Sequence, residues 1–431
     1  MRIGLLSFGG PAGQIAVMHR VLVEEKRWIG ESRFLHALNF CMLLPGPEAQ
    51  QLATYIGWLL HGARGGLVAG LLFVLPGFVA LMTLSFVYVL WHREPVIEGL
   101  FLGLKAAVIA LVIEALVRIA KRALRTPASR VIAVAAFVAI AFAHLPFPAV
   151  IIAAGGVGYL AARWGHPLTT TAARDQTRDS EPDAGVPLRE VKPTPARAIR
   201  LLALWLPLWF APVLSAALWL GGAHVFTQLG VFFSKMAVVT FGGAYAVLTY
   251  VAQQAVERFG WVTPAQMMDG LGLAESTPGP LIMVVQFVGF LAAYHAAGGE
   301  NPLLMGALGA VITVWVTFVP CFLWIFLGAP YVERVRENVA LSSALAAITA
   351  AVVGVIANLA LWFALRVLFD RLERWQVLGV SSVDLPILTT LRVVPAGLTA
   401  LALVLMFGFR QGLARTLTIC ASLGALATLL A

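Results

Sequence analysis

The chain contains the same set of helix-breaking motifs twice, and this repeat constrains its fold more than any other feature. Phe8-Gly9-Gly10 recurs as Phe241-Gly242-Gly243, and Pro45-Gly46-Pro47 recurs as Pro278-Gly279-Pro280. Both pairs keep one offset of 233 positions (241 − 8 and 278 − 45). The sequence is therefore a fused duplication. In an apolar chain, segments interrupted by Gly and Pro at matching positions of two halves point to the substrate site of a transporter.

The composition places the chain in a lipid bilayer. Of its 431 residues, 60% are hydrophobic and 12% are charged, and the mean hydropathy is +0.88. A soluble domain carries about 25% charged residues, so this chain has too few to cover a water-exposed surface. Several apolar runs reach the roughly 20 residues that span a bilayer. The predicted fold class is an all-α, polytopic integral membrane protein with two homologous halves.

Each half is expected to hold six apolar segments. In the first half they lie at approximately 3–25, 33–60, 66–92, 96–121, 129–143 and 146–163. Their counterparts lie at approximately 224–256, 264–296, 302–328, 338–368, 386–407 and 411–431, and one further segment near 200–221 has no partner. We therefore divide the chain into a first repeat at 1–163, a cytoplasmic linker at 164–200, an unpaired membrane segment at 201–221 and a second repeat at 222–431.

The orientation of the halves depends on how many segments cross the bilayer. If all six cross in each half, the unpaired segment turns the second half upside down and produces inverted repeats with broken helices. In the alternative, the Pro-Gly-Pro elements are re-entrant and each half crosses five times, which inverts the halves only if 200–221 does not span. Arg118, Lys121 and Arg122, like the Arg-containing linker, favour a cytoplasmic position. We expect inverted repeats.

The glycine pairs predict a break inside an apolar helix in each half. Gly9-Gly10 and Gly242-Gly243 stand in otherwise helical patterns, and paired glycines are a common cause of a kink. A break creates a half-helix whose first N–H groups and dipole favour an anion. Ser7 and Thr240 precede the breaks at equivalent positions and add hydroxyls. The alternative is close helix packing through small residues.

The two Pro-Gly-Pro elements interrupt the next apolar segment, because two prolines around a glycine cannot continue an α-helix. In Pro45-Gly46-Pro47 and Pro278-Gly279-Pro280 the second proline suits the first position of a new half-helix. Glu48 follows the first element, and Glu275-Ser276-Thr277 precedes the second. A carboxylate at membrane depth is a functional candidate, here an ion or proton carrier. Glu48 has a structural alternative, a negative charge in the first helical turn.

Four further charged residues fall in apolar segments. Arg2 and Lys235 are a repeat pair that stands five residues before Ser7 and Thr240 (7 − 2 and 240 − 235). A cation there raises the local concentration of an anion, whereas Arg2 has an interfacial role as its alternative. Lys105 and Glu114 share one helix at roughly opposed azimuths, and we expect them to find different partners.

Other classes of chemistry have no support in the sequence. The histidines lack metal-ligand spacing, and Cys41, Cys321 and Cys420 are far apart and odd in number, as small core residues would be. No Gly-rich phosphate loop with Lys-Ser/Thr is present, and no basic patch with interleaved aromatic residues indicates nucleic acid. We expect no cofactor, no metal, no nucleic-acid partner and no enzymatic activity.

Four motifs, LLSFGGPAGQIAVMHR, LLPGPEAQQLATYIGWLLHG, VTFGGAYAVLTYV and AESTPGP, resemble the chromate ion transporter family, of the long type with two homologous domains. The resemblance implies proton-driven efflux of chromate across the bacterial inner membrane, and hence chromate resistance. It also implies a functional core made of Gly9, Gly10, Gly242, Gly243, both Pro-Gly-Pro elements, Glu48, Gln51, Thr240, Tyr245 and Glu275. Only seven residues precede Phe8, so the first half either has a shortened helix or starts upstream.

Together these arguments predict a secondary transporter whose half-helix ends converge on a dianionic oxyanion. The predicted substrate-binding residues are those of the implied core other than its two glutamates, together with Ser7, Lys235, Ser276 and Thr277. The predicted ion-coupling residues are Glu48 and Glu275. The expected partners are chromate or sulfate, protons and the lipid bilayer, and a homodimer stays open. The alternatives are uptake or exchange of sulfate or another oxyanion, a gated anion channel, and a membrane enzyme acting on an oxyanion.

Overall fold

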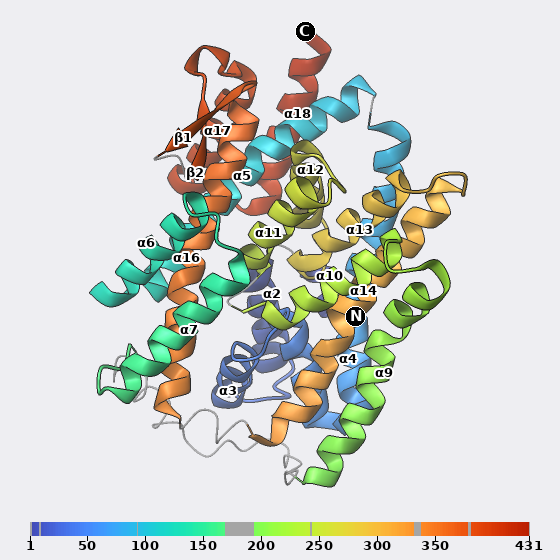
Figure 1. Cartoon of the computed structure of the whole chain (residues 1–431), viewed down its shortest axis with the longest axis vertical. Helices are drawn as coiled ribbons and strands as arrows, with labels where there is room; N and C mark the ends of the chain where they lie inside the picture. The colour runs from blue at the N-terminus through green and yellow to red at the C-terminus, as the bar shows by residue number, and fades with distance from the viewer. Residues whose placement is uncertain are drawn as a thin grey trace.

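The computed structural model describes residues 2–7, 10–92, 94–168, 194–241, 244–331, 338–377 and 381–430. Almost all of this described chain is helical (Figure 1). Six of its helices are long and apolar enough to cross a membrane, namely α4 (Glu48–Trp91), α5 (Pro95–Ala123), α9 (Pro195–Leu220), α14 (Pro302–Gly328), α16 (Val339–Leu368) and α18 (Leu413–Leu430). These helices confirm the predicted polytopic, helical class.

The remaining elements begin in the same order in each half, and the second half contains further short helices and two strands. The first half also contains α1 (Arg2–Leu6), α2 (Gly10–His19), the π-helix η1 (Arg20–Glu25), α3 (Glu31–Cys41), α6 (Pro127–Ala141) and α7 (Phe147–Arg163). The second half contains α10 (Val225–Val239), α11 (Ala244–Gln253), the π-helix η2 (Gln254–Arg258), α12 (Pro264–Ser276), η3 (Leu281–Met283), α13 (Val284–His295), η4 (Ala329–Tyr331), β1 (Leu372–Val377), β2 (Ser381–Pro386), η5 (Leu388–Thr390), α17 (Val393–Leu403) and η6 (Val404–Gly408).

The second half begins with two helical hairpins. In the first, α10 and α11–η2 lie against each other, since the Phe232 ring stands 5.5 Å from Tyr250 and 5.6 Å from Phe259. In the second, α12 and α13 fold back on each other, so that His295 Nδ1, at the end of α13, lies 3.3 Å from Trp261 O, just before α12. The helix interruptions predicted from the sequence are therefore the tips of these hairpins.

The first half repeats both hairpins. Arg2 Nη1 lies 3.1 Å from Glu25 Oε2, which closes the open end of the α1–α2–η1 hairpin. The rings of Phe40 and Tyr55 stand 5.0 Å apart on α3 and α4. α4 joins two helices across a kink at His61-Gly62, and only its first part belongs to the hairpin. Each Pro-Gly-Pro element thus turns the chain back, which favours the re-entrant alternative over six full crossings in each half.

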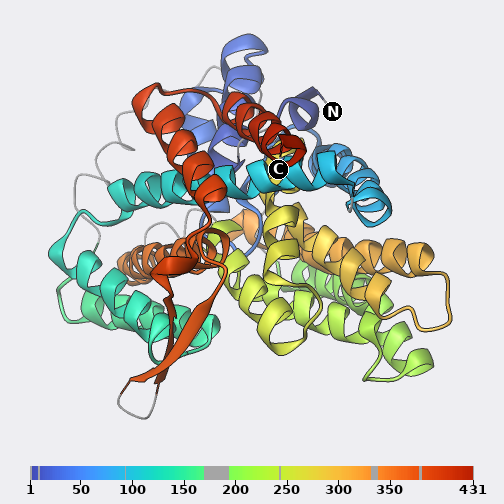
Figure 2. The ribbon, with the colours of Figure 1, turned by 90° about the horizontal axis from the view of Figure 1, so that it is seen from above.

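The long helices of the two halves are interlocked. α6 and α7 of the first half pack against α16 of the second, while α17 and α18 of the second half pack against α5 of the first (Figures 1 and 2). Small residues allow the contact at both places. Gly158 of α7 approaches Ser343 O and Ala344 Cα of α16, and Gly424 of α18 approaches Gly103 of α5. In a bilayer, such close backbone approach is a main source of helix association.

Replacing Gly158 with leucine is expected to separate α7 from α16. A Cβ at this position would stand 2.5 Å from Ser343 O and 2.6 Å from Ala347 Cβ. We expect a loss of about 2–3 kcal/mol from overpacking, measured as a lower midpoint of thermal unfolding in detergent. Gly156→Leu is the matched control, because nothing lies within 4 Å of a Cβ there. Equal midpoints for the two variants would contradict the proposed packing role.

A β-hairpin lies between two predicted apolar segments, in a stretch where the sequence predicted neither helix nor strand. β1 pairs with β2 in antiparallel register, from Leu372 opposite Pro386 to Val377 opposite Ser381. The segment expected at 386–407 overlaps the hairpin only at Pro386, and its helix α17 starts later than expected, at Val393. The hairpin projects from the helices in Figure 2. Polar and apolar side chains alternate over 374–377 and 382–385, which suits a half-exposed strand pair, and this short period-2 pattern was the missed signal.

Candidate functional site

The four hairpin tips meet through two reciprocal backbone hydrogen bonds. Gly46 N–H donates to Thr240 O at 2.8 Å, and Gly279 N–H donates to Ser7 O at 2.9 Å. The two bonds are equivalent by the repeat, because Gly279 lies 233 positions after Gly46 and Thr240 lies 233 positions after Ser7. Each Pro-Gly-Pro tip is therefore fastened to the glycine-containing break of the opposite half. The structure thus brings together at one place the four interruptions that the sequence had only placed in pairs. We call this meeting point of the hairpin tips the crossing.

Glycine is required at both Pro-Gly-Pro tips. Gly46 has φ +123° and Gly279 has φ +105°, values that side-chain-bearing residues rarely adopt. A Cβ on Gly279 would lie 2.9 Å from the Cα of Gly77, and a Cβ on Gly46 would lie 2.9 Å from Sγ of Cys321. Gly77 and Cys321 occupy equivalent positions of α4 and α14. Each tip thus also packs against the long helix of the opposite half.

Two buried glutamines hold the tips. Gln51 Nε2 donates to Pro45 O at 2.6 Å, and Gln14 Nε2 donates to Gly279 O at 2.6 Å. Within the described part of the chain, the side-chain oxygens of Gln50 and Gln51 are buried without a hydrogen-bond partner. Unsatisfied buried polar atoms are uncommon in folded proteins. These two oxygens leave hydrogen-bond acceptors at the crossing that no described protein group fills. Gln14 and Gln50 were not predicted from the sequence.

A buried tyrosine–carboxylate pair lies beside the second tip. Tyr245, in the first turn of α11, donates its hydroxyl to Glu275 Oε1 near the end of α12. Both residues are buried, with 5% and 3% of their surface exposed. The equivalent positions in the first half hold Ala12 and Met42, so this pair exists in one half only. A buried carboxylate without a full charge partner is costly, which makes it the strongest candidate for coupling.

The other predicted residues take several positions. Ser7 and Thr240 donate their hydroxyls at 2.6 Å to the carbonyls of Ile3 and Met236, four residues earlier in their own helices. Ser276 and Thr277 donate likewise within α12, to Leu273 O at 2.9 Å and Ala274 O at 3.2 Å. In this conformation these hydroxyl protons are already engaged at the helix ends.

Glu48 and Gly10 each open a helix at the crossing. Glu48 is the first residue of α4, after the N-cap Pro47, and Gly10 begins α2 with φ +71°. Lys235 does not lie at the tips, because it lines a groove between α10 and η2. Gly9, Gly242 and Gly243 lie outside the described residues, as does most of the predicted linker, at 169–193.

Comparison with known proteins identifies the family. The chromate transporter family matches residues 1–159 and 227–428, which together form most of the chain. The chain belongs to the chromate transporter family. It is 34% identical over 361 residues to the chromate transport protein of Pseudomonas aeruginosa, covering 83% of this chain and 77% of that relative. It is 28% identical over 370 residues to the chromate transport protein of Cupriavidus metallidurans, covering 86% and 82%. No solved structure matches the chain.

This chromate transporter family member also has a buried ion pair between its halves. Lys105 Nζ of α5 lies 3.2 Å from Asp269 Oδ1 of α12, and Tyr88 donates its hydroxyl to Asp269 Oδ2 at 3.0 Å. Glu114 pairs instead with Arg118 at 3.3 Å, which confirms that Lys105 and Glu114 find different partners. Asp269 was not predicted from the sequence. The signal was a carboxylate in an apolar helix, as at Glu275, which lies in the same helix and was singled out because it precedes the second Pro-Gly-Pro element.

Replacing Asp269 with asparagine is expected to lower stability by about 2 kcal/mol, because Lys105 would remain in a mostly buried position without a counter-charge. The readout is the thermal unfolding midpoint of the purified protein. The double variant Lys105→Met/Asp269→Asn removes the unpaired charge and is expected to regain most of the loss. A double variant no more stable than Asp269→Asn would show that the ion pair does not carry the effect.

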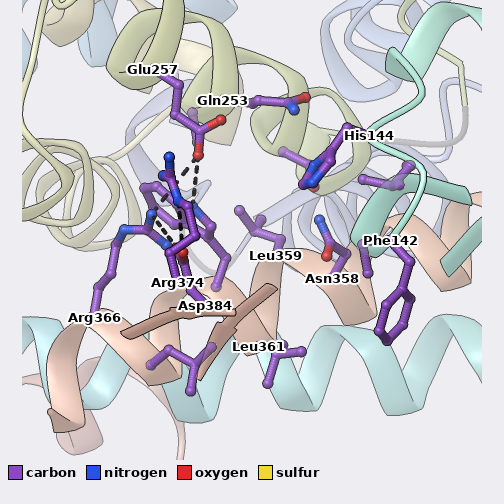
Figure 3. A pocket seen from close by; sticks show the side chains of 16 residues that line it. Phe142, His144, Gln253, Glu257, Asn358, Leu359, Leu361, Arg366, Arg374 and Asp384 are labelled. Carbon is purple, nitrogen blue, oxygen red and sulfur yellow. Dashed lines mark hydrogen bonds and ion pairs between the residues drawn. The ribbon is translucent and has the colours of Figure 1, made fainter. Parts of the chain in front are cut away.

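A charged cavity of about 170 Å³ lies beside the β-hairpin (Figure 3). Arg366 of α16 lies 3.2 Å from Asp384 of β2 and 3.9 Å from Glu257 of η2, and Arg374 of β1 lies 3.6 Å from Asp384. Figure 3 shows these side chains pointing toward one another at one end of the cavity. Their positive and negative charges balance. The arrangement therefore ties the hairpin to α16 and η2 and has no excess charge to attract an anion.

Among the described residues, no group of three or more His, Cys, Asp or Glu side chains is placed to hold a metal ion. The candidate site at the tips contains helix ends, the side-chain amides of Gln14 and Gln51 and the Tyr245–Glu275 pair.

Proposed function

We propose that this protein is a secondary transporter that exports chromate across the bacterial inner membrane, uses the proton motive force and confers chromate resistance. Family membership and a multi-pass helical fold support transport. The observation that carries the proposal is the reciprocal crossing of the hairpin tips, where Gly46 bonds Thr240 O and Gly279 bonds Ser7 O. It creates one central point that both halves reach equally. We propose transport rather than catalysis as its role.

The crossing favours an anion through its helix ends. Four helical segments, α2, α4, α11 and η3, begin at the tips. Their first N–H groups lack intrahelical acceptors and carry the positive end of the helix dipole. The two carbonyls at the opposing ends, Ser7 O and Thr240 O, are already occupied by the tip hydrogen bonds. The balance of free backbone groups therefore favours a dianionic oxyanion. The glycines 9, 10, 242 and 243 and the prolines of both tips would let the backbone approach it.

Coupling is assigned to the carboxylates. Glu275 is buried and has one hydrogen-bond donor in Tyr245, so taking up a proton would remove a charge that is costly to bury. Glu48, at the first turn of α4, is the second candidate. Moving a dianion toward a positive exterior is itself favourable by about 4.6 kcal/mol per 100 mV, twice the value for one charge. Protons would therefore set direction and gating more than supply the driving force.

The two halves differ at one contact in a way that suits alternating access. α11 packs against α16, where Thr249 Oγ1 lies 3.4 Å from Val355 O. Among the residues that the structure describes, the equivalent helices α2 and α5 do not pack together to this extent. A transporter with halves in inverted orientation would exchange these two arrangements as the site opens to one side and then the other. Because both hairpins of each half turn back, four helices are left to cross in each half: the second part of α4, α5, α6 and α7 in the first, and α14, α16, α17–η6 and α18 in the second. One crossing of α9 between the halves then inverts the second half relative to the first. We propose this orientation for the repeats, and a monomer or homodimer as the working unit.

The test is uptake of radiolabelled chromate by everted membrane vesicles that contain the protein. In these vesicles, export from the cell becomes uptake into the lumen. We expect saturable uptake that rises with an imposed proton gradient and is absent from vesicles without the protein. Excess unlabelled sulfate ranks the two oxyanions, since their charge and shape are alike. Protein-dependent flux far above carrier rates, without saturation, would instead favour a gated anion channel.

A further inference from the structure

A groove runs between the two arms of the α10–α11–η2 hairpin, separate from the crossing. Its volume is about 200 Å³. Gln228, Val231 and Lys235 line one wall, and Tyr250, Gln254 and Arg258 line the other. Both sets follow the helical spacing of three to four residues. The groove extends from Gly222, in the loop before α10, inward to Lys235, which stands one turn before the tip residue Thr240.

The groove is cationic. Lys235 and Arg258 both line it, and none of its described lining residues is acidic. Arg258 Nη1 is 3.4 Å from Gln254 Oε1, a neutral partner that leaves its charge uncompensated. The cavity beside the β-hairpin contains two arginines but also two carboxylates, Glu257 and Asp384. Of these two cavities, only the groove has a net charge suited to an anion.

Comparison of the repeats shows that this charge is specific to one half. Lys235 corresponds to Arg2, and Arg258 corresponds to Glu25 (258 − 233). In the first half the two side chains form an ion pair at 3.1 Å. In the second half a base replaces the acid, which turns a neutral pair into two like charges on one groove. Like charges held together are unfavourable, and an anion between them would relieve that repulsion.

We propose that the groove binds a tetrahedral oxyanion between Lys235 and Arg258, with the Tyr250 hydroxyl and Gln254 amide on the same wall as further donors. The occupant is a free oxyanion of the sulfate and chromate class. A role for the groove as an intermediate binding site, between the open end of the hairpin and the tips, rests on the proposed function. Binding of the oxyanion in the groove does not rest on it. A phospholipid headgroup carries the same oxyanion chemistry and is the competing source.

The test measures equilibrium binding of radiolabelled sulfate to the purified full-length protein in uncharged detergent. Arg258→Glu installs the residue found at the equivalent position 25 and allows an ion pair with Lys235, so the variant is expected to fold. We expect sulfate affinity at this site to fall at least about ten-fold at low salt. Lys235→Gln is expected to weaken binding as well. Arg415→Glu, on the exposed face of α18, is the control with the same change of charge.

Unchanged binding in Arg258→Glu, or an equal loss in Arg415→Glu, would overturn the proposal. A parallel arm places the protein in nanodiscs of phosphatidylcholine with or without phosphatidylglycerol and follows retained lipid by native mass spectrometry. Phosphatidylglycerol that displaces sulfate and is retained by the wild type but not by Arg258→Glu would make the lipid the occupant and overturn the free-ion assignment. Glu275→Gln separates the two proposals, because it is expected to lose transport while the groove still binds sulfate.

Discussion

Replacing Glu275 with glutamine is expected to reduce gradient-driven chromate uptake by everted vesicles at least about ten-fold, a change of 1.4 kcal/mol or more in the transport barrier. Glutamine has nearly the same shape and can still accept a hydrogen bond from Tyr245, so the fold should persist. It cannot gain or lose a proton. The effect should therefore appear in uptake driven by the proton gradient, with the amount of inserted protein unchanged.

Tyr245→Phe is the companion variant. It removes the donor to Glu275 and leaves the carboxylate able to titrate, so we expect a smaller loss of uptake and a changed dependence on pH. The control is chromate exchange without a gradient, which measures substrate movement alone. Full gradient-driven uptake by Glu275→Gln, at wild-type levels of inserted protein, would remove this residue from coupling and leave Glu48 as the candidate.

Replacing Gly279 with alanine is expected to destabilise the protein by about 3–4 kcal/mol and to abolish transport. Alanine at φ +105° is strained, and its Cβ would stand 2.9 Å from the Cα of Gly77, which is backbone and cannot rotate away. The tip would have to move, and the hydrogen bond to Ser7 O would be lost with it. Thermal unfolding and vesicle uptake measure the two effects.

Alanine substitutions at two other glycines distinguish the cost of backbone strain from the cost of a steric clash. At Gly46 the nearest groups are the ends of Gln51 and Cys321 side chains, at 2.8 and 2.9 Å, so Gly46→Ala is expected to cost less than Gly279→Ala. Gly298 has φ +58° with nothing within 4 Å, and its alanine variant should lose about 1 kcal/mol from strain alone. Equal losses at all three positions would contradict the close approach at the second tip.

The periodicity of the sequence predicted much of the secondary structure because bilayer helices must satisfy their backbone internally. The repeated Gly and Pro motifs predicted the four interruptions that separate α1 from α2, α3 from α4, α10 from α11 and α12 from η3, since these residues act on local backbone geometry. The same local logic failed between α16 and α17. There a β-hairpin is held by side chains from other elements, Arg366 with Asp384 among them, and hydropathy carries no information about such partners.

The candidate site residues divide along the same line. Glu275 and the two tips were predicted because a carboxylate or a proline in an apolar run is conspicuous by itself, whereas Tyr245 was predicted only from the family resemblance. Asp269, Gln14 and the groove around Arg258 were missed, because their meaning depends on what lies opposite. Lys235 was predicted as a binding residue at the break, whereas its side chain lines the groove between α10 and η2. Its position in the sequence predicted how close to the break it lies along the helix, but not which face of the helix it occupies.

The sequence by itself determined that this protein is a duplicated, helical membrane protein with four interruptions at equivalent places, because composition and local chain stiffness decide those properties. Only the tertiary structure decided that each tip bonds to the opposite half, and that α6–α7 and α17–α18 exchange partners across the repeats. These contacts join residues that lie far apart in the sequence, 194 positions for Gly46 and Thr240 (240 − 46). They depend on shape, on small residues that allow close approach and on unpaired backbone groups, none of which a single segment of sequence reveals.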